Sequence, residues 1–307
     1  MQYSAPNYGI KPSPTPTNTQ SAKRKIYICI GISVGIFVLL CVLGLGLGLG
    51  LGLKKSNSSP NSDTCDARTA KCGCPSVQPS TSSRIVNGTL ATANSWPWMV
   101  AIYVSNGKFC GGTLITYEHI LTAAHCVFDV NNTDIIVYAG IQKLSDRQNG
   151  QVRNISTITV HPNYDDTIKV NDLAVLKLSS PLSQSTKVGL CCLSTSLSPT
   201  IGDSATFIGW GRTSANSTFS DDLLQAKTEV VNSSYCSYAP LTSNQICTGN
   251  TGSIACYGES GSPLMMKLNN YWTCVGVVNM GLLTCDSYFV FTRVSPYDSF
   301  IYNATSL

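Results

Sequence analysis

Three polar residues along the chain could together make a serine hydroxyl reactive. His125 lies in the stretch LTAAHC, Asp172 in NDLAVLKL and Ser260 in CYGESGSPL. A serine hydroxyl is a poor nucleophile at neutral pH, so a neutral imidazole must accept its proton as it attacks. His125 could take that proton, and Asp172 could fix the imidazole tautomer and stabilise the imidazolium. These residue types therefore indicate nucleophilic catalysis.

The elements that must position these residues are short strands. From Ile85 onward the chain contains many short runs rich in Val, Ile, Thr and Tyr, broken by Gly, Pro and Asn. Examples are WMVAIYV, DIIVYAG, LAVLKL and CVGVVNM. Runs of this length, with almost no helical periodicity, predict an all-β barrel or sandwich. Only the last stretch, SPYDSFIYN, could form a short helix.

Five motifs occur in an order that resembles the trypsin and chymotrypsin-like serine proteases. They are RIVNG (residues 84–88), LTAAHC, NDLAVLKL, GWG (residues 209–211) and CYGESGSPL. The resemblance extends from about Cys72 to the end of the chain. It implies hydrolysis of peptide bonds by two six-stranded antiparallel Greek-key β-barrels, followed by a short C-terminal helix. It also implies that the backbone N–H groups of Gly258 and Ser260 stabilise the oxyanion.

The RIVNG motif further implies a zymogen. In the family, cleavage after the Arg frees an amine that folds inward and pairs with the carboxylate preceding the nucleophile. Here the cut follows Arg84, and Ile85 pairs with Glu259, which stands where the family has Asp. The longer side chain shifts the carboxylate by about 1.5 Å, one C–C bond length. Some backbone adjustment is therefore expected.

Other departures from the family surround the pocket for the residue before the cut bond. Ile254 stands at the pocket floor, where a buried Arg or Lys of a substrate finds no charged partner. Phe289 stands where the family usually has Gly, and we expect its ring to fill much of the pocket. Small or medium apolar residues are therefore expected before the cut bond. The remaining departures and wall positions are Asn279 (in place of a Ser that helps hold the triad Asp), Met280 (for a Trp), Gly281 and Ser262 (for a Gly).

A long apolar run precedes the strand-rich part. Residues 26–53 contain no charge over 28 positions, and as a helix they reach about 42 Å, enough to cross a bilayer. The run is too long and too far from the start for a cleaved signal peptide, so we predict an uncleaved signal anchor. The basic residues 23–25 outweigh those at 54–55, which predicts a cytoplasmic N-terminus.

The predicted organisation therefore has four parts and is similar to that of type II transmembrane serine proteases. They are a disordered cytoplasmic tail (1–25), a transmembrane signal anchor (26–53), an extracellular stem or propeptide (54–84) and a serine protease domain (85–307). This predicts a single-pass type II protein of the plasma membrane, with an extracellular or lumenal catalytic domain. The glycosylation sequons agree, because all follow the apolar run: Asn57, Asn87, Asn131, Asn154, Asn216, Asn232 and Asn303.

The cysteines indicate a disulfide framework. Twelve of the 14 lie beyond the apolar run, and none forms a cluster with zinc-finger spacing. We expect Cys192 to tether the stem, with Cys74 as its partner, and Cys191–Cys274 to replace a family bridge that is missing. The resemblance itself implies Cys110–Cys126, Cys236–Cys247 and Cys256–Cys285.

The distribution of charge along the chain indicates which classes of partner the protein can bind. The net charge of +4 divides into +7 for residues 1–84 and −3 for residues 85–307, where 11 Lys and Arg face 14 Asp and Glu. The folded part is thus slightly acidic, which argues against a nucleic-acid partner. No metal or organic cofactor is expected; residues 141–158 offer only Asp146 for the calcium site of some relatives. The expected partners are protein or peptide substrates, an activating trypsin-like protease and protein protease inhibitors.

Two other classes of function remain open at this point. A catalytically weak or inactive homologue could use the same fold for binding, as Glu259, Ser262, Asn279 and Phe289 suggest. A structural adhesion protein is the third alternative. Retention of all three candidate catalytic residues favours the protease, since a fold freed from catalysis has no chemical reason to keep them.

Overall fold

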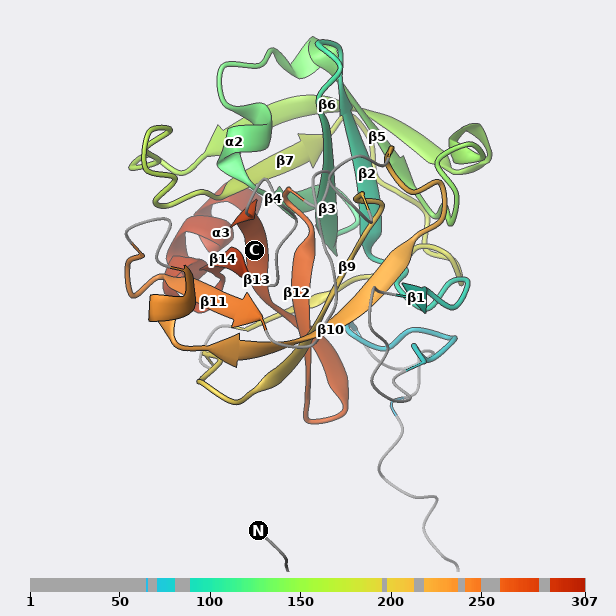
Figure 1. Cartoon of the computed structure of the whole chain (residues 1–307). Coiled ribbons are helices and arrows are strands. Elements are labelled where there is room, and N and C mark those ends of the chain that lie inside the picture. Colours follow the sequence, from blue (N-terminus) through green and yellow to red (C-terminus); the bar gives the residue numbers. More distant parts are fainter. Residues whose placement is uncertain are drawn as a thin grey trace, which may run out of the picture. The chain divides into compact units, whose positions relative to one another are not determined.

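Six antiparallel strands close into a first β-barrel (Figure 1). The computed structural model describes residue 65 and residues 71–80, 89–194, 198–212, 218–236, 241–249, 260–281 and 288–306. β2 pairs with both β3 and β5, which closes the ring. In barrel order the strands are β2 (Met99–Val104), β3 (Phe109–Thr116), β4 (His119–Thr122), β7 (Ala174–Leu178), β6 (Gln151–Val160) and β5 (Ile135–Ala139).

A second set of strands forms the other barrel. Its order is β9 (Ser204–Gly209), β10 (Leu224–Val231), β11 (Gln245–Gly249), β14 (Phe289–Arg293), β13 (Tyr271–Gly281) and β12 (Pro263–Leu268), and β12 pairs back to β9. β1 (Thr89–Leu90) adds to β10, and β8 (Cys192–Leu193) runs parallel to β13. The structure thus confirms the two predicted six-stranded antiparallel barrels.

The helices in the described part of the chain are short and lie outside the barrels. α2 (Ala124–Val127) follows β4, and α3 (Asp298–Thr305) closes the chain, as the sequence predicts. Asp298 lies in the first turn of α3, where an acidic side chain complements the helix dipole, and Ile301 and Thr305 are buried. The single turns of 3-10 helix are η1 (Asn132–Asp134), η2 (Arg147–Asn149), η3 (Ser233–Cys236) and η4 (Ser295–Tyr297).

The barrel interiors are filled by aliphatic and aromatic side chains. In β2 and β3 nearly every position is buried, because one face points into the barrel and the other is covered by neighbouring segments. Trp98, Ile102 and Leu114 are fully buried in the larger core, and Phe207 and Phe291 lie in the core of the second barrel. These two cores hold the loops that carry the candidate site.

Residues 71–80, part of the predicted stem, are joined to the barrels by a bridge that differs from the predicted one. Cys192 pairs with Cys72, while the expected partner, Cys74, pairs with Cys65. The reason lies in Gly73, whose φ of 67° belongs to the left-handed region. Its N–H donates to the Leu190 carbonyl (2.8 Å) and its carbonyl accepts from Trp272 N–H (2.7 Å). This fixed backbone places Cys72, the residue before Gly73, next to Cys192.

The other predicted bridges have mixed outcomes. Cys110–Cys126 and Cys236–Cys247 are formed. Cys191–Cys274 is not: both are buried free thiols, and their Sγ atoms are directed to different carbonyls, Cys192 O and Gly276 O. Burial raises the pKa of the Cys274 thiol to about 12 and also raises that of Cys191. The predicted Cys256–Cys285 bridge lies outside the described residues.

The structure corrects the localisation prediction. Among the residues that it describes, no helix has the length and apolar character needed to cross a membrane. This finding contradicts the single-pass type II membrane protein, and we do not retain that assignment. The segment on which the prediction fell, residues 26–53, lies outside the described residues.

The structure describes some of the predicted glycosylation positions and not others. Four are exposed, as a glycan requires: Asn131, Asn154, Asn232 and Asn303. The other three, Asn57, Asn87 and Asn216, lie outside the described residues.

The stem bridge gives a test. After trypsin cleavage at Arg84, we expect the peptide that ends at this residue to stay attached through Cys72. A Cys65→Ser/Cys74→Ser double variant should keep the attachment, whereas Cys72→Ser should lose it. Intact mass under denaturing, non-reducing conditions measures the outcome. Release of the peptide from the double variant would instead support the bridge through Cys74.

Candidate active site

His125 and Asp172 are brought together by strand pairing in the first barrel. β4 ends at Thr122, which lies opposite Ala174 at the start of β7. Residues just after β4 and just before β7 are therefore neighbours. The chain enters α2 directly after β4, which places His125 beside the Asp172 loop.

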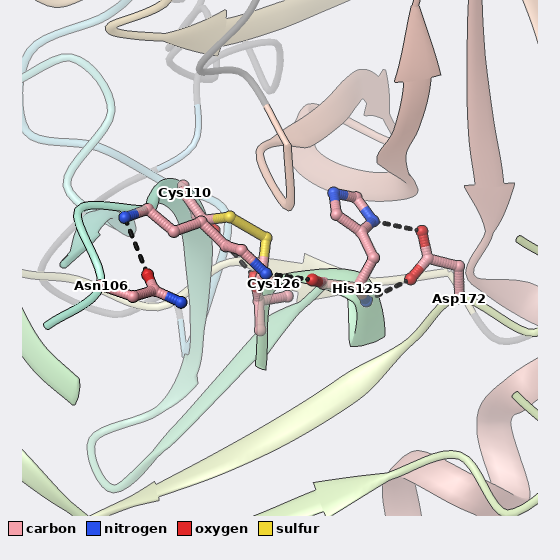
Figure 2. Close-up of a disulfide and its surroundings, with 8 residues drawn as sticks. Asn106, Cys110, His125, Cys126 and Asp172 are labelled. Carbon is pink, nitrogen blue, oxygen red and sulfur yellow. Dashed lines mark hydrogen bonds and ion pairs between the residues drawn. A yellow bond between two sulfur atoms is a disulfide. The ribbon is translucent and has the colours of Figure 1, made fainter. Parts of the chain in front are cut away.

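The Asp172 carboxylate makes two hydrogen bonds to one residue (Figure 2). Its Oδ2 accepts from His125 Nδ1 at 2.7 Å, and its Oδ1 accepts from His125 backbone N–H at 2.8 Å. The carboxylate is fully buried, while the imidazole is 17% exposed. A carboxylate acceptor requires the ring proton on Nδ1, so Nε2 is left to accept a proton from a substrate-side group.

The loop that carries Asp172 is held by side chains from β13 and η4, which lie outside the first barrel. Asn171 has a φ of 52°, and its side-chain oxygen accepts from the Tyr297 hydroxyl at 2.9 Å. Asn279 Nδ2 donates to the Lys169 carbonyl at 2.7 Å and to Thr292 Oγ1 at 3.0 Å. Asn279, which stands where the family has a Ser that helps hold the aspartate, thus contacts the backbone of this loop.

Ser260 lies in the turn before β12 and is fixed by β3. Gly111 N–H donates to the Ser260 carbonyl at 2.8 Å. Gly111 is next to Cys110, whose bridge to Cys126 reaches the residue after His125, and Figure 2 shows this bridge beside the imidazole. Ser260 and His125 both line one hollow of about 490 Å³. The fold therefore brings all three candidate catalytic residues to one place.

Close packing between the Ser260 turn and β3 depends on glycine. A Cβ on Gly111 would overlap with the Ser262 hydroxyl, and a Cβ on Gly261 would overlap with Thr122 Oγ1. Ser262 is fully buried, and among the described residues its hydroxyl has no hydrogen-bond partner. The Ser262 side chain thus fills the space that is available because Gly111 has no side chain. Sequence reasoning missed Gly111 and Thr122, although the paired glycines in FCGGTLIT were a signal.

The predicted pocket residues are only partly described. Phe289 is 4% exposed and packs in the core of the second barrel, with its ring centroid 5.8 Å from that of Phe207. It pairs with Gly281 across β13 and β14, and Met280 is half-buried. Other predicted site residues lie outside the described residues: Arg84, Ile85, Ile254, Gly258 and Glu259.

The remaining histidines have structural surroundings. His119 is buried and shares a 2.8 Å hydrogen bond with Thr116, and the His161 ring lies 4.8 Å from that of Phe300. Burial lowers the pKa of both imidazoles. In the described part of the chain, one group of potential metal ligands is close enough to share an ion: Cys110, Cys126 and His125. It does not fit a metal, because the two sulfurs are bonded to each other.

The contact between Gly111 and Ser262 can be tested by compensation. We expect Gly111→Ala to lower the free energy of unfolding by about 1–3 kcal/mol, since overpacking a tight site forces backbone shifts. It should also slow fluorophosphonate labelling of Ser260, which Gly111 N–H holds. The Gly111→Ala/Ser262→Gly double variant should recover both quantities, because the new methyl then fits the vacated space. Thermal unfolding and labelling rates measure the two effects; a fully stable and reactive Gly111→Ala would contradict the argument.

Comparisons with known proteins agree with this geometry. The family model described as Trypsin matches residues 85–301. Mouse Chymotrypsin-C is 34% identical over 252 residues, which cover 76% of this chain and 92% of the relative. Bovine Chymotrypsin-C is 33% identical over 251 residues (76% and 94%), and the rat protein is 33% identical over 250 residues (75% and 92%). The chain belongs to the trypsin family of chymotrypsin-like serine proteases.

Proposed function

We propose that the chain is a serine endopeptidase that cleaves peptide bonds through Ser260, His125 and Asp172. The observation that carries the proposal is the hydrogen bond between His125 and the buried Asp172, with Ser260 lining the same hollow as the imidazole. Membership of the trypsin family supports a hydrolase that cleaves proteins and is bound by protein inhibitors.

The geometry supports a two-step acyl transfer. Ser260 Oγ attacks the carbonyl carbon as His125 Nε2 takes the hydroxyl proton, and Asp172 stabilises the imidazolium. The backbone N–H groups of Gly258 and Ser260 bind the oxyanion, where loss of one donor costs about 3 kcal/mol. The imidazolium then protonates the leaving amine, the C–N bond breaks, and water repeats the sequence on the acyl-enzyme.

We further propose that the chain is a zymogen cut after Arg84 by a protease that cleaves after basic residues. The new amine of Ile85 then pairs with Glu259, next to the nucleophile. β1 begins four residues after Ile85 and pairs with β10, which supports attachment of this segment to the second barrel. A buried charge without its partner is costly by several kcal/mol, so the pair orders the loop only after cleavage.

The inactive homologue is the weaker candidate. One reason for it was Ser262, which replaces a Gly in the nucleophile turn. That side chain is accommodated against Gly111, and the turn keeps its hydrogen bonds to β3 and β13. An accommodated Ser262 therefore supports the protease.

Covalent labelling tests the reaction. After trypsin cleavage at Arg84, we expect a fluorophosphonate to label the chain at Ser260. Labelling should disappear in Ser260→Ala and fall by at least about 10⁴-fold in His125→Ala, because nucleophile and base act as a unit. Arg84→Gln should block activation but leave the triad intact. Failure of the cleaved wild type to label would favour the binding homologue.

A peptide library tests specificity. With Ile254 at the floor and Phe289 at a wall, we expect cleavage after Ala, Val or Leu, with rates that follow apolar area at about 25 cal/mol per Å² until the side chain meets the ring. The wild-type profile is the appropriate measurement, because Phe289 is a core residue and its truncation costs about 3–5 kcal/mol of stability. A profile dominated by Arg or Lys would overturn this assignment.

A further inference from the structure

A second hollow, of about 440 Å³, lies on the second barrel, and neither His125 nor Ser260 lines it. Three segments form its walls: residues 199–201 before β9, residues 230–233 at the end of β10, and residues 241–243 before β11. These segments are far apart in the sequence, so the hollow exists only because the barrel brings them together.

The walls of this hollow are fixed by hydrogen bonds between the segments. The Arg293 guanidinium of β14 donates from Nε to the Ser243 carbonyl and from Nη1 to the Pro199 carbonyl, both at 2.9 Å. Gly202 N–H donates to the Val230 carbonyl at 2.8 Å. Because these contacts hold the walls in place, a group that enters the hollow loses little free energy in ordering the protein.

Apolar and hydroxyl side chains occur together in the hollow. Ile201 is 66% exposed, and Val231 and Leu241 are half-buried. Thr242 and Ser243 follow in the chain and are exposed, and their hydroxyl oxygens can accept hydrogen bonds. A sugar ring matches such a surface, because it has C–H groups on its faces and hydroxyl groups at its edge. Covering the apolar side chains is favourable, since it removes them from water.

Asn232 lies on the wall of the hollow and begins the triplet Asn-Ser-Ser, which accepts an N-linked glycan. Its side chain is exposed, and its Oδ1 accepts a hydrogen bond from the Ser234 backbone N–H at 2.9 Å. This Asx turn fixes the carboxamide group, so Nδ2, the atom to which a sugar is attached, has a set position at the wall. The other described glycosylation positions, Asn131, Asn154 and Asn303, do not line the hollow.

The disulfides indicate a compartment in which glycans are added. Four bridges are formed among the described residues. Such bridges form in the oxidising environment of the secretory route. N-linked glycans are attached to Asn in the same route. A chain that acquires these bridges therefore also meets the glycan donor.

We propose that Asn232 carries an N-linked glycan and that its first N-acetylglucosamine occupies this hollow, where it covers Ile201 and Leu241. The new N–C bond forms as Asn232 Nδ2 attacks the anomeric carbon of a lipid-linked diphosphate oligosaccharide. The bond between that carbon and the diphosphate oxygen breaks, the diphosphate keeps the electron pair, and one amide proton passes to a base of the transferase. The proposal is independent of the protease function, since the hollow shares no residue with the triad.

Peptide mass mapping tests whether Asn232 is modified. The full chain is expressed in cells that add N-linked glycans and keep them rich in mannose. We expect a glycan at Asn232 in the wild type and in Ser234→Thr, because Thr also completes the triplet. Ser234→Ala and Asn232→Asp should lose it, although the Asp side chain keeps an oxygen that accepts from the Ser234 N–H. An unmodified Asn232 in the wild type would overturn the proposal.

Thermal unfolding tests whether the sugar occupies the hollow. We expect Tm to fall by about 2–4 °C in Ser234→Ala and Asn232→Asp, the shift that one stabilising contact gives in a domain of this size. Ser234→Thr should keep the wild-type Tm. An endoglycosidase that leaves one N-acetylglucosamine on Asn should also leave Tm unchanged, whereas an amidase that removes the whole glycan should lower it. Equal Tm values with and without the Asn232 glycan, or a loss on trimming to one sugar, would contradict the assignment.

A comparison of double variants identifies the contact. Ile201→Ser should lower Tm in the glycosylated chain, because the sugar loses its apolar partner, and should change it little in the Ser234→Ala background. Asn303→Asp removes a glycosylation position on α3 that does not line the hollow, so the effect of Ile201→Ser should persist in that background. An equal effect of Ile201→Ser with and without the Asn232 glycan would show that the sugar and Ile201 do not touch.

Discussion

The buried Asp172 carboxylate needs hydrogen-bond partners, and this need determines how the residues around it are arranged. Asp172 has no exposure to solvent, and an ionised carboxylate without partners costs several kcal/mol in such a place. His125 supplies both hydrogen bonds that the structure gives it, one from the ring and one from the backbone. The imidazole is therefore fixed in position and tautomer by the same contacts that make the buried charge tolerable. The same two hydrogen bonds thus hold the loop and orient the imidazole ring.

Ser260 is positioned by a different constraint, close packing of backbone against backbone. The Ser260 turn lies so near β3 that Gly111 and Gly261 have no room for a Cβ. The contact carries a hydrogen bond from Gly111 to Ser260 and lies next to the Cys110–Cys126 bridge at His125. One strand of the first barrel thus contacts the Ser260 turn and is bridged to the residue after His125, although Ser260 itself leads into a strand of the second barrel.

The hollow at the site combines both kinds of interaction. Phe109 of β3 packs against Phe219, Lys108 Nζ donates to the His125 carbonyl, and the Arg212 guanidinium lies over the Phe219 ring. Positive charge at this position opposes the acidic balance of the folded part.

The sequence by itself determined the features that depend on short stretches of chain. Strand-rich runs predicted an all-β barrel or sandwich, the resemblance carried by five short motifs implied two barrels, and SPYDSFIYN predicted α3. The segments around His125, Asp172 and Ser260 named the candidate site, because residue type and local spacing carry that chemistry. Tertiary structure decided what depends on partners far apart in the chain. Cys72 rather than Cys74 reaches Cys192, 120 residues away, because the Gly73 backbone is fixed by Leu190 and Trp272. Ser262 is tolerated because Gly111 leaves it space, and Asn279 binds the Lys169 carbonyl instead of Asp172. Such outcomes follow from which side chains meet in space, and no local pattern encodes the distances between them.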